Sequence, residues 1–214
     1  MPPHIQINGV NMNAKIDVTN IKIETQRLIL RPWEKTDLQD LYEYASVPGV
    51  GEMAGWTHHQ SIKESASILD IFIAEKKTFA VVYKENNKVI GSLGLEHLDH
   101  VEEEIPPSFQ GREIGYVLSK EFWGQGLMSE AVQAVVEYCF KELKYEFLTC
   151  AHFIRNNQSR RVIEKAGFQF LKDIESETRY GTVEDTKLYV RFNSYLGWEL
   201  PGRFAKWLDE RYRR

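Results

Sequence analysis

The sequence predicts a mixed α/β fold in which helices flank a single central sheet. Two amphipathic helical segments come first, two strand-like runs joined by a turn follow, and alternating strands and helices complete the order. With 214 residues, 43% of them apolar and 27% charged, the chain has the length and composition of one well-buried globular unit. We expect residues 23–194 to form this unit as a single domain.

The early segments carry clear start signals for a strand and two helices. Residues 1–22 are polar and rich in asparagine, and we expect a poorly packed N-terminal arm there. Residues 27–31 are typical of a short strand. The next segment predicts a helix capped by Thr36 that ends before a Pro-Gly pair. A second helix is predicted after Ser61, because Glu64 three residues later completes a capping box.

The middle of the chain predicts a hairpin, a loop, a strand and a long helix. Residues 78–83 and 88–97 are strand-like and flank turn residues, which favours a β-hairpin. Three consecutive glutamates and two prolines predict an exposed loop at 99–112. A strand is expected at 113–119, and apolar residues at helical spacing predict a helix over 127–143.

The remaining segments predict alternating structure followed by an aromatic tail. We expect a strand at 147–153 and a helix at 156–166, which Gly167 ends in a left-handed cap. Two further strands are predicted at 168–174 and 187–192. From residue 195 aromatic and basic residues dominate, and we expect this tail, 195–214, to pack on its own domain; a dimer or partner surface is the alternative.

Composition excludes several classes of function. No apolar run approaches the roughly 20 residues that span a bilayer, and the net charge of −4 argues against a nucleic-acid binder. Cys139 and Cys150 are too few for a disulfide framework, and no Cys/His spacing suggests a metal site. We therefore expect a cytoplasmic monomer or homodimer with no metal and no nucleic-acid or membrane partner.

The junction between the strand at 113–119 and the helix at 127–143 predicts an anion site. Gly124 and Gly126 allow the backbone to approach a ligand without a Cβ in the way. The helix N-terminus adds N–H donors and the positive end of its dipole, which suit a phosphate. The Lys-Ser/Thr of a nucleotide P-loop and the third glycine of a dinucleotide fingerprint are both missing. A plain tight turn is the alternative interpretation.

Four motifs occur in unbroken order across residues 22–193. They are T-x-R-L-x-L-R-P from Thr25, E-I-G-Y-V from Glu113, W-G-Q-G-L-M-S-E-A from Trp123 and N-x-x-S-R-x-V-x-E-K-x-G-F from Asn156. Together they resemble the GNAT superfamily of acyl-CoA-dependent N-acetyltransferases. Within it they are most similar to the ribosomal-protein alanine N-acetyltransferase-like branch.

This resemblance implies a GNAT fold, whose largely antiparallel sheet is splayed in the middle and flanked by about four helices, and acetyl-CoA as cosubstrate. The pantetheine arm would lie in the split and pair with backbone groups near Val117 and Leu118. Asn156 would bond the amides of that arm, and it can also cap the following helix. Main-chain donors would hold the diphosphate; they belong to Gly124, Gln125, Gly126, Leu127, Met128 and Ser129. Trp123 and Met128 depart from the family's loop pattern, which leaves a side-chain role there in doubt.

The resemblance also implies candidates for proton transfer. Glu113 is the candidate base, acting directly or through water, and a solvated strand-end carboxylate is the alternative. His152 is a reserve relay, although a lone histidine in a strand is more often a packed residue. Many GNAT enzymes use a tyrosine four residues before the Gly-Phe pair, where this chain has Ile163. Ser159, or a water, therefore remains as the acid for the leaving thiolate.

The expected reaction is acetyl transfer to a primary amine by direct attack in a ternary complex. The leading acceptor is a protein or peptide N-terminal amine, and a small amine such as a polyamine, amino acid or antibiotic is the second. A backbone N–H near Val117 or Leu118 would polarise the thioester carbonyl. A non-catalytic acyl-CoA-binding module is the alternative from a different class. Cys150 has no evident neighbouring base and is expected to pack as a small apolar residue.

Overall fold

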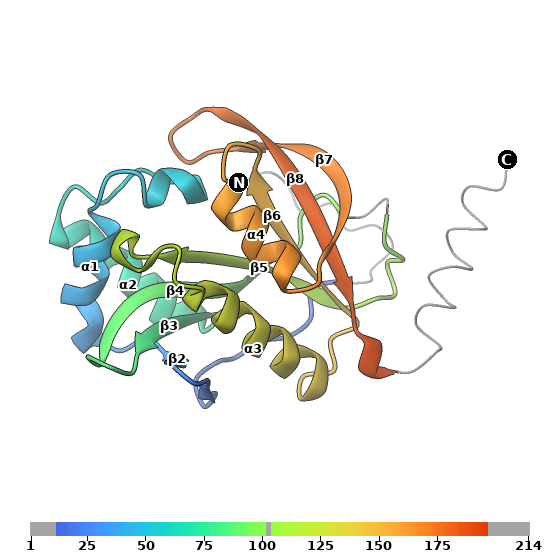
Figure 1. The fold of residues 1–214 in the computed structure, drawn as a ribbon, viewed down its shortest axis with the longest axis horizontal. Helices are drawn as coiled ribbons and strands as arrows, with labels where there is room; N and C mark the ends of the chain where they lie inside the picture. Colours follow the sequence, from blue (N-terminus) through green and yellow to red (C-terminus); the bar gives the residue numbers. More distant parts are fainter. Residues whose placement is uncertain (1–11, 102–103, 197–214) are drawn as a thin grey trace, which may run out of the picture.

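The computed structural model describes residues 12–101 and 104–196 (Figure 1). Within them, one sheet has the strand order β1-β2-β3-β4-β5-β6-β8-β7. The strands are β1 (Ile23–Glu24), β2 (Leu28–Pro32), β3 (Thr78–Tyr83), β4 (Lys88–Glu96), β5 (Gly111–Leu118), β6 (Phe147–Phe153), β7 (Gln169–Glu177) and β8 (Val183–Phe192). The helices are α1 (Leu38–Ala45), α2 (Ile62–Glu75), α3 (Leu127–Lys141) and α4 (Asn157–Lys165).

The sheet is antiparallel except at its centre, where β5 and β6 run parallel. Within the described residues, these two strands pair only from Gly111 to Ile114 and from Phe147 to Cys150. Beyond this point each strand stays paired with its other neighbour, β5 with β4 and β6 with β8. The predicted mixed α/β fold, with its largely antiparallel and centrally splayed sheet, is confirmed.

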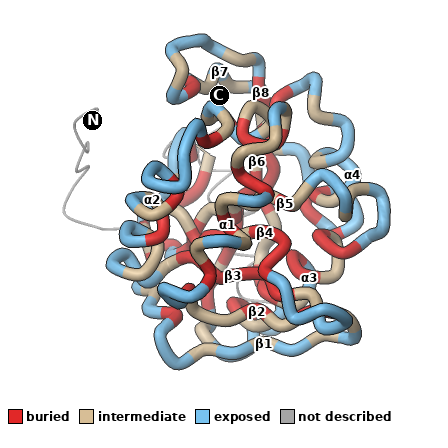
Figure 2. Tube along the Cα trace, turned by 90° about the vertical axis from the view of Figure 1, so that its left-hand side faces the viewer, coloured by how far each residue is buried: buried red, intermediate tan, exposed pale blue. Residues whose placement is uncertain are grey.

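Helices cover both faces of the sheet and enclose two cores. One core joins α3 and α4 to the strands through residues such as Val132, Val136 and Ile163. The other joins α1 and α2 to the opposite face through Leu41 and Leu69. In Figure 2 the buried strands run between α2 on one side and α3 and α4 on the other. This division follows from the alternation of side chains along each strand.

The start of the first helix differs from its prediction. Thr36 lies inside a short 3₁₀ turn, Lys35–Asp37, and is not the cap of α1. Asp37 directly precedes α1, but its side chain does not bond the N–H groups of that helix. Its carboxylate instead accepts a hydrogen bond from the Glu34 N–H at 2.8 Å and pairs with Arg31 at 2.7 Å, which holds the 3₁₀ turn against β2. The Ser61 cap of α2 is confirmed, since its hydroxyl accepts from the Glu64 N–H.

The loop at 99–112 is not simply exposed, contrary to its prediction. Val101, Ile105 and Phe109 are all buried, and they pack in a third core with Phe147 of β6 and Leu188 of β8. The acidic and proline-rich composition concealed three apolar residues spaced four apart. This loop therefore covers one end of the sheet as a packed element.

Residues 12–22 are also better packed than the sequence predicts. Met12, Ala14 and Val18 are buried, and Gly111 at the start of β5 bonds to both Met12 and Ala14. The expectation of poor packing is wrong for this part of the arm, because its few apolar residues each reach the core. The predicted tail lies outside the described residues from residue 197 on.

None of the helices in the described part of the chain is both long and apolar enough to cross a bilayer.

Candidate active site

A cavity of about 760 Å³ lies where β5 and β6 separate. Its lining comes from the second half of β5, the glycine loop, the end of β6, one side of α4 and the hairpin of β7 and β8. A 3₁₀ turn at Gly51–Ala54 closes it from the side of α1 and α2. Segments distant in sequence thus meet at the one place where the sheet is open (Figure 1).

The glycine loop has the backbone that its sequence predicts. Gly124 and Gly126 have φ values of +77° and +78°, in a backbone region that residues other than glycine rarely adopt. No described atom lies within 4 Å of a Cβ built at Gly124, and at Gly126 only the Arg27 Nη2 comes that close, at 3.7 Å. The loop therefore presents open backbone to the cavity.

The first turn of α3 supplies N–H donors beside this loop. Gly126 is the N-cap, and its carbonyl accepts from the Glu130 N–H at 3.1 Å. The N–H groups of Leu127, Met128 and Ser129 precede the first intrahelical donor and so point out of the helix end. The side chains of Leu127 and Met128 are buried in the core, which leaves only their main chain for a ligand.

A clasp that sequence reasoning missed fixes this helix end. The Glu130 carboxylate accepts hydrogen bonds from the Thr25 hydroxyl, the Arg27 N–H and the Arg27 Nε. Burial alone would raise the pKa of Glu130, but these bonds hold it below its usual value. The Arg27 Nη1 also donates to the carbonyl of Gln125 at 3.0 Å. The T-x-R motif therefore positions the loop and does not merely begin a strand.

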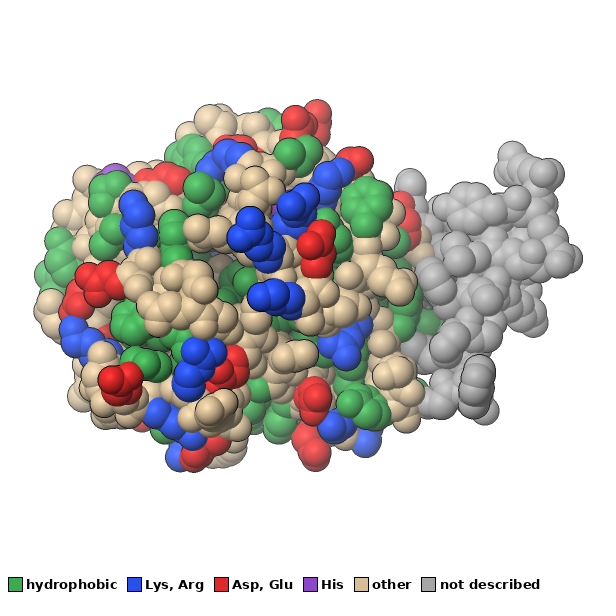
Figure 3. Space-filling model, in the orientation of Figure 1, with side chains coloured by type: hydrophobic (Ala, Val, Ile, Leu, Met, Phe, Trp, Pro, Cys, Tyr) green, Lys and Arg blue, Asp and Glu red, His purple; other side chains and the backbone are tan. Residues whose placement is uncertain are grey.

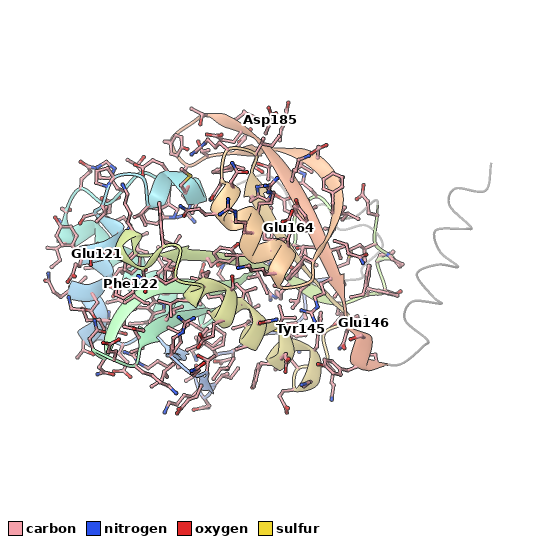
Figure 4. All side chains as sticks on the ribbon, in the orientation of Figure 1. Glu121, Phe122, Tyr145, Glu146, Glu164 and Asp185 are labelled. Atoms are coloured by element: carbon pink, nitrogen blue, oxygen red, sulfur yellow. The ribbon has the colours of Figure 1, made fainter. Side chains whose placement is uncertain are left out.

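The turn before the glycine loop is stabilised by hydrogen bonds from side chains of the loop itself. Figure 4 marks Glu121 and Phe122 there, and the Gln125 side chain donates to the Glu121 carbonyl at 3.0 Å. The Trp123 indole donates to the Leu118 carbonyl at 2.8 Å. Trp123, where the loop departs from the expected pattern, thus has a structural role.

Val117 and Leu118, the two residues expected to pair with a pantetheine arm, differ in the direction of their backbone groups. Ser119 donates to the Ile90 carbonyl of the neighbouring chain segment, and Leu118 lies opposite Gly91. Because backbone groups alternate in direction along a strand, Val117 faces β4 as Ser119 does. A Cβ built at Gly91 would lie 2.3 Å from the Val117 carbonyl oxygen, in agreement. Leu118 is therefore the residue whose N–H faces the split.

Glu113 lies at the inner end of the split, on the face of the sheet that carries α1 and α2. Its Oε2 accepts a hydrogen bond from the Thr149 hydroxyl, 3.3 Å away on β6. Burial raises the pKa of Glu113 to about 8, and the nearby carboxylates of Asp99 and Glu96 act in the same direction. A carboxyl group tuned to this range can take a proton near neutral pH.

Ser159 lies on the opposite face of the sheet, in the first turn of α4. Its Oγ is 2.8 Å from the hydroxyl of Tyr116, a β5 residue that the sequence analysis did not select. Asn156 caps α4 by accepting from the Ser159 N–H at 3.1 Å, and its Nδ2 donates to the Met53 carbonyl at 3.1 Å. The capping role of Asn156 is thus confirmed, while its bond to a pantetheine arm stays a prediction.

The family model described as Acetyltransferase (GNAT) domain matches residues 27–169, about two thirds of the chain. The chain belongs to the GNAT acetyltransferase family. It is 29% identical over 174 residues to the uncharacterized N-acetyltransferase YoaA of Bacillus subtilis, covering 78% of this chain and 94% of that protein.

Two solved structures of acetyltransferases show the same fold. The ribosomal-protein-S5-alanine acetyltransferase of Vibrio fischeri has a TM-score of 0.61 at 20% identity, covering 81% of this chain and 97% of the other. The microcin C7 self-immunity acetyltransferase MccE, solved with acetyl-CoA and AMP, has a TM-score of 0.61 at 16% identity, covering 78% and 93%.

The residues of this GNAT domain fit acetyl-CoA. The left-handed glycines leave room that a Cβ would fill, and the N–H groups of the first turn of α3 suit a diphosphate. Lys and Arg side chains gather over α4 in Figure 3, and Arg161 and Lys165 of that helix line the cavity. Their charge complements a phosphorylated ligand.

The remaining candidates, His152 and Cys150, are not placed for proton transfer or nucleophilic attack. The His152 Nδ1 is 2.8 Å from the Phe153 carbonyl, and its Nε2 is 3.4 Å from the Tyr189 hydroxyl. Burial raises the pKa of the Cys150 thiol well above its usual value, so this residue is a poor nucleophile. In the described ranges, no three His, Cys, Asp or Glu side chains gather as a metal site.

Proposed function

We propose that this N-acetyltransferase acetylates the α-amine of a protein or peptide, with Glu113 as base and Ser159 as donor to the leaving sulfur. The observation that carries the proposal is Glu113, which is half-buried, lines the cavity and has its pKa raised to about 8. A free α-amine has a pKa of roughly 7.7–8.0, whereas a lysine amine lies near 10.4. The base is thus matched to an α-amine and poorly matched to a lysine.

The alternation of β5 side chains supports attack from opposite sides of the sheet. Glu113 faces the side of α1 and α2, whereas Tyr116, three residues later, contacts Ser159 on the side of α4. The amine would enter along the Gly51–Ala54 turn, and acetyl-CoA would lie along α3 and α4. The two reactants would meet within the split, which supplies proximity and orientation.

Acetyl-CoA supplies an acetyl thioester that is already activated for transfer. Main-chain N–H groups from Gly124 to Ser129 would bind its diphosphate, and the N–H of Leu118 would polarise the thioester carbonyl. Glu113 would accept the amine proton, directly or through water. Asn156 would orient the pantetheine arm, in exchange for its present bond to Met53.

An acceptor panel tests this proposal. Free-thiol release from acetyl-CoA is measured with peptides bearing free N-termini, matched peptides with blocked N-termini and an internal lysine, polyamines and amino acids. Turnover only with free N-termini supports the proposal. Turnover only with small amines overturns the acceptor assignment, and tight acetyl-CoA binding without any turnover would favour a non-catalytic binding module.

The activity should rise with pH through about 8. Glu113 must be ionised to accept a proton, so kcat at saturating acceptor should increase as pH rises through its pKa of about 8 and then level off. At pH 7 the rate should be about a tenth of the plateau, from simple titration of one group. The measurement is kcat from pH 6 to 10, with acceptor and acetyl-CoA both saturating. A flat profile of kcat across this range contradicts the assignment.

Ser159→Ala should lower kcat while leaving acetyl-CoA affinity unchanged. Hydrogen bonds to charged groups contribute about 1.5–3 kcal/mol, so a loss of about 10- to 100-fold in kcat is expected when the leaving thiolate loses its donor. Steady-state kinetics and calorimetry measure the two quantities. Ser67→Ala, on the exposed side of α2, is the matched control and should behave as wild type. An unchanged kcat in Ser159→Ala would remove Ser159 from the mechanism.

A further inference from the structure

The hydroxyl of Tyr116 contacts α4 at Ser159, the residue proposed as donor to the leaving sulfur. The tyrosine expected from the family four residues before the Gly-Phe pair is replaced here by Ile163, which is buried and lies in α4. Here a tyrosine hydroxyl reaches the same helix from the strand on the other side of the split. Tyr116 and Ser159 both line the cavity, and their oxygens are 2.8 Å apart.

The Tyr116 hydroxyl contacts three polar groups, namely the Ser159 carbonyl oxygen, the Ser159 Oγ and the Cys150 thiol. Its hydroxyl is 3.2 Å from the Ser159 carbonyl oxygen, which can only accept, and 2.8 Å from the Ser159 Oγ. The carbonyl oxygen can only accept the tyrosine proton, whereas in the contact between the two hydroxyls either oxygen can be the donor. Burial raises the pKa of Tyr116 well above its usual value, so the hydroxyl keeps its proton and remains a donor.

We propose that Tyr116 is a positioning residue that donates to Ser159 and so directs the Ser159 hydroxyl proton toward the leaving sulfur. This inference rests on the proposed function of Ser159. A serine hydroxyl has one proton and two acceptor lone pairs. When Tyr116 donates to one lone pair, the serine proton is kept out of that contact and is free for the cavity.

The step needs no other reactant. The amine nitrogen forms the C–N bond to the acetyl carbon, the C–S bond breaks with its electron pair on sulfur, and the amine proton goes to Glu113. A thiol has a pKa near 8.5, so the departing thiolate is stabilised sufficiently by a hydrogen bond from Ser159. Solvent protonates it after release. Tyr116 and Ser159 end the step with the protons with which they began.

A double-mutant cycle between Tyr116→Phe and Ser159→Ala tests this inference. Tyr116→Phe keeps the ring and should lower kcat by about fivefold, the contribution of one hydrogen bond, with KM for acetyl-CoA unchanged. In the Ser159→Ala background the same substitution should have no further effect, because the hydroxyl that it orients is already absent. A merely structural role of Tyr116 would lower activity in both backgrounds.

Tyr145→Phe is the matched control. Tyr145 is also a buried tyrosine whose hydroxyl bonds a backbone carbonyl, that of Lys15 at 2.7 Å, but it lies at the far end of α3 from Phe122 (Figure 4). Its loss should affect thermal stability without changing kcat. Thermal melting and acetyl-CoA calorimetry confirm that each variant is folded.

The outcomes separate this inference from the proposed function. An active wild type with unchanged kcat in Tyr116→Phe, or with additive losses in the double variant, overturns the role of Tyr116 alone. A wild type that binds acetyl-CoA but acetylates no amine overturns the proposed function and this inference together. Loss of kcat in Tyr116→Phe that disappears in the Ser159→Ala background supports both.

Discussion

Gly126→Val should lower acetyl-CoA affinity by about two orders of magnitude, because a β-branched residue at φ +78° is strained and its side chain would occupy the proposed diphosphate site. Among the described atoms, only the Arg27 Nη2 lies within 4 Å of a Cβ built at this position. The added side chain therefore meets little of the protein itself, and its steric effect falls on the ligand. Isothermal titration calorimetry with acetyl-CoA measures the loss.

Gly181→Val separates the effect of backbone strain from the effect on the ligand. Gly181 has nearly the same φ, +81°, and no described atom lies within 4 Å of its Cβ, but it is in the turn between β7 and β8. This variant should lose a comparable amount of thermal stability and still bind acetyl-CoA as wild type does. Wild-type affinity in Gly126→Val would remove the loop from the cosubstrate site.

Glu113→Gln should lower kcat by about 100-fold or more, the usual contribution of a positioned general base, and leave acetyl-CoA affinity unchanged. Glutamine has the same shape and can still accept from the Thr149 hydroxyl, but it cannot take a proton from the amine. The measurement is kcat at saturating acceptor and acetyl-CoA. The ascending limb of the pH profile near pH 8 should disappear in the same variant.

Glu175→Gln makes the same chemical change at an exposed position on β7 and should leave kcat unaltered. A Glu113→Gln variant with kcat close to wild type would instead assign proton transfer to water alone. In that case the raised pKa of Glu113 would reflect its burial and have no part in catalysis.

The helices and strands could be predicted where apolar residues recur at a single spacing, either that of a helix or that of a strand. The apolar stripe of α3 and the hairpin of β3 and β4 were visible from spacing alone, since each buries one consistent face. The first helix was placed correctly but its cap was not. The Arg31–Asp37 pair joins a strand to that helix start, and no local pattern encodes it.

The site could be predicted only in part, for a similar reason. Gly124 and Gly126 mark the loop because a left-handed backbone restricts the residue type locally. The clasp that holds this loop joins Arg27 to Glu130 across a separation of 103 residues, and the contact of Tyr116 with Ser159 spans 43. Such pairs become neighbours only through the order of strands, which no single segment contains. If the strand order of the sheet had been assumed, the alternation of side chains along β5 would have placed Tyr116 on the face of the sheet that α4 covers.

The opening between β5 and β6 gives this sheet a feature that sheets ordinarily have only at their rims, namely backbone groups without a neighbouring strand. At a rim such groups invite other proteins to add a strand, which is a route to aggregation. Here the opening lies between helices that cover both faces of the sheet. A folded protein is therefore too bulky to reach the unpaired backbone groups, whereas a thin, extended chain of amides can reach them. The width of the opening thus selects ligands by their cross-section before any specific contact is made.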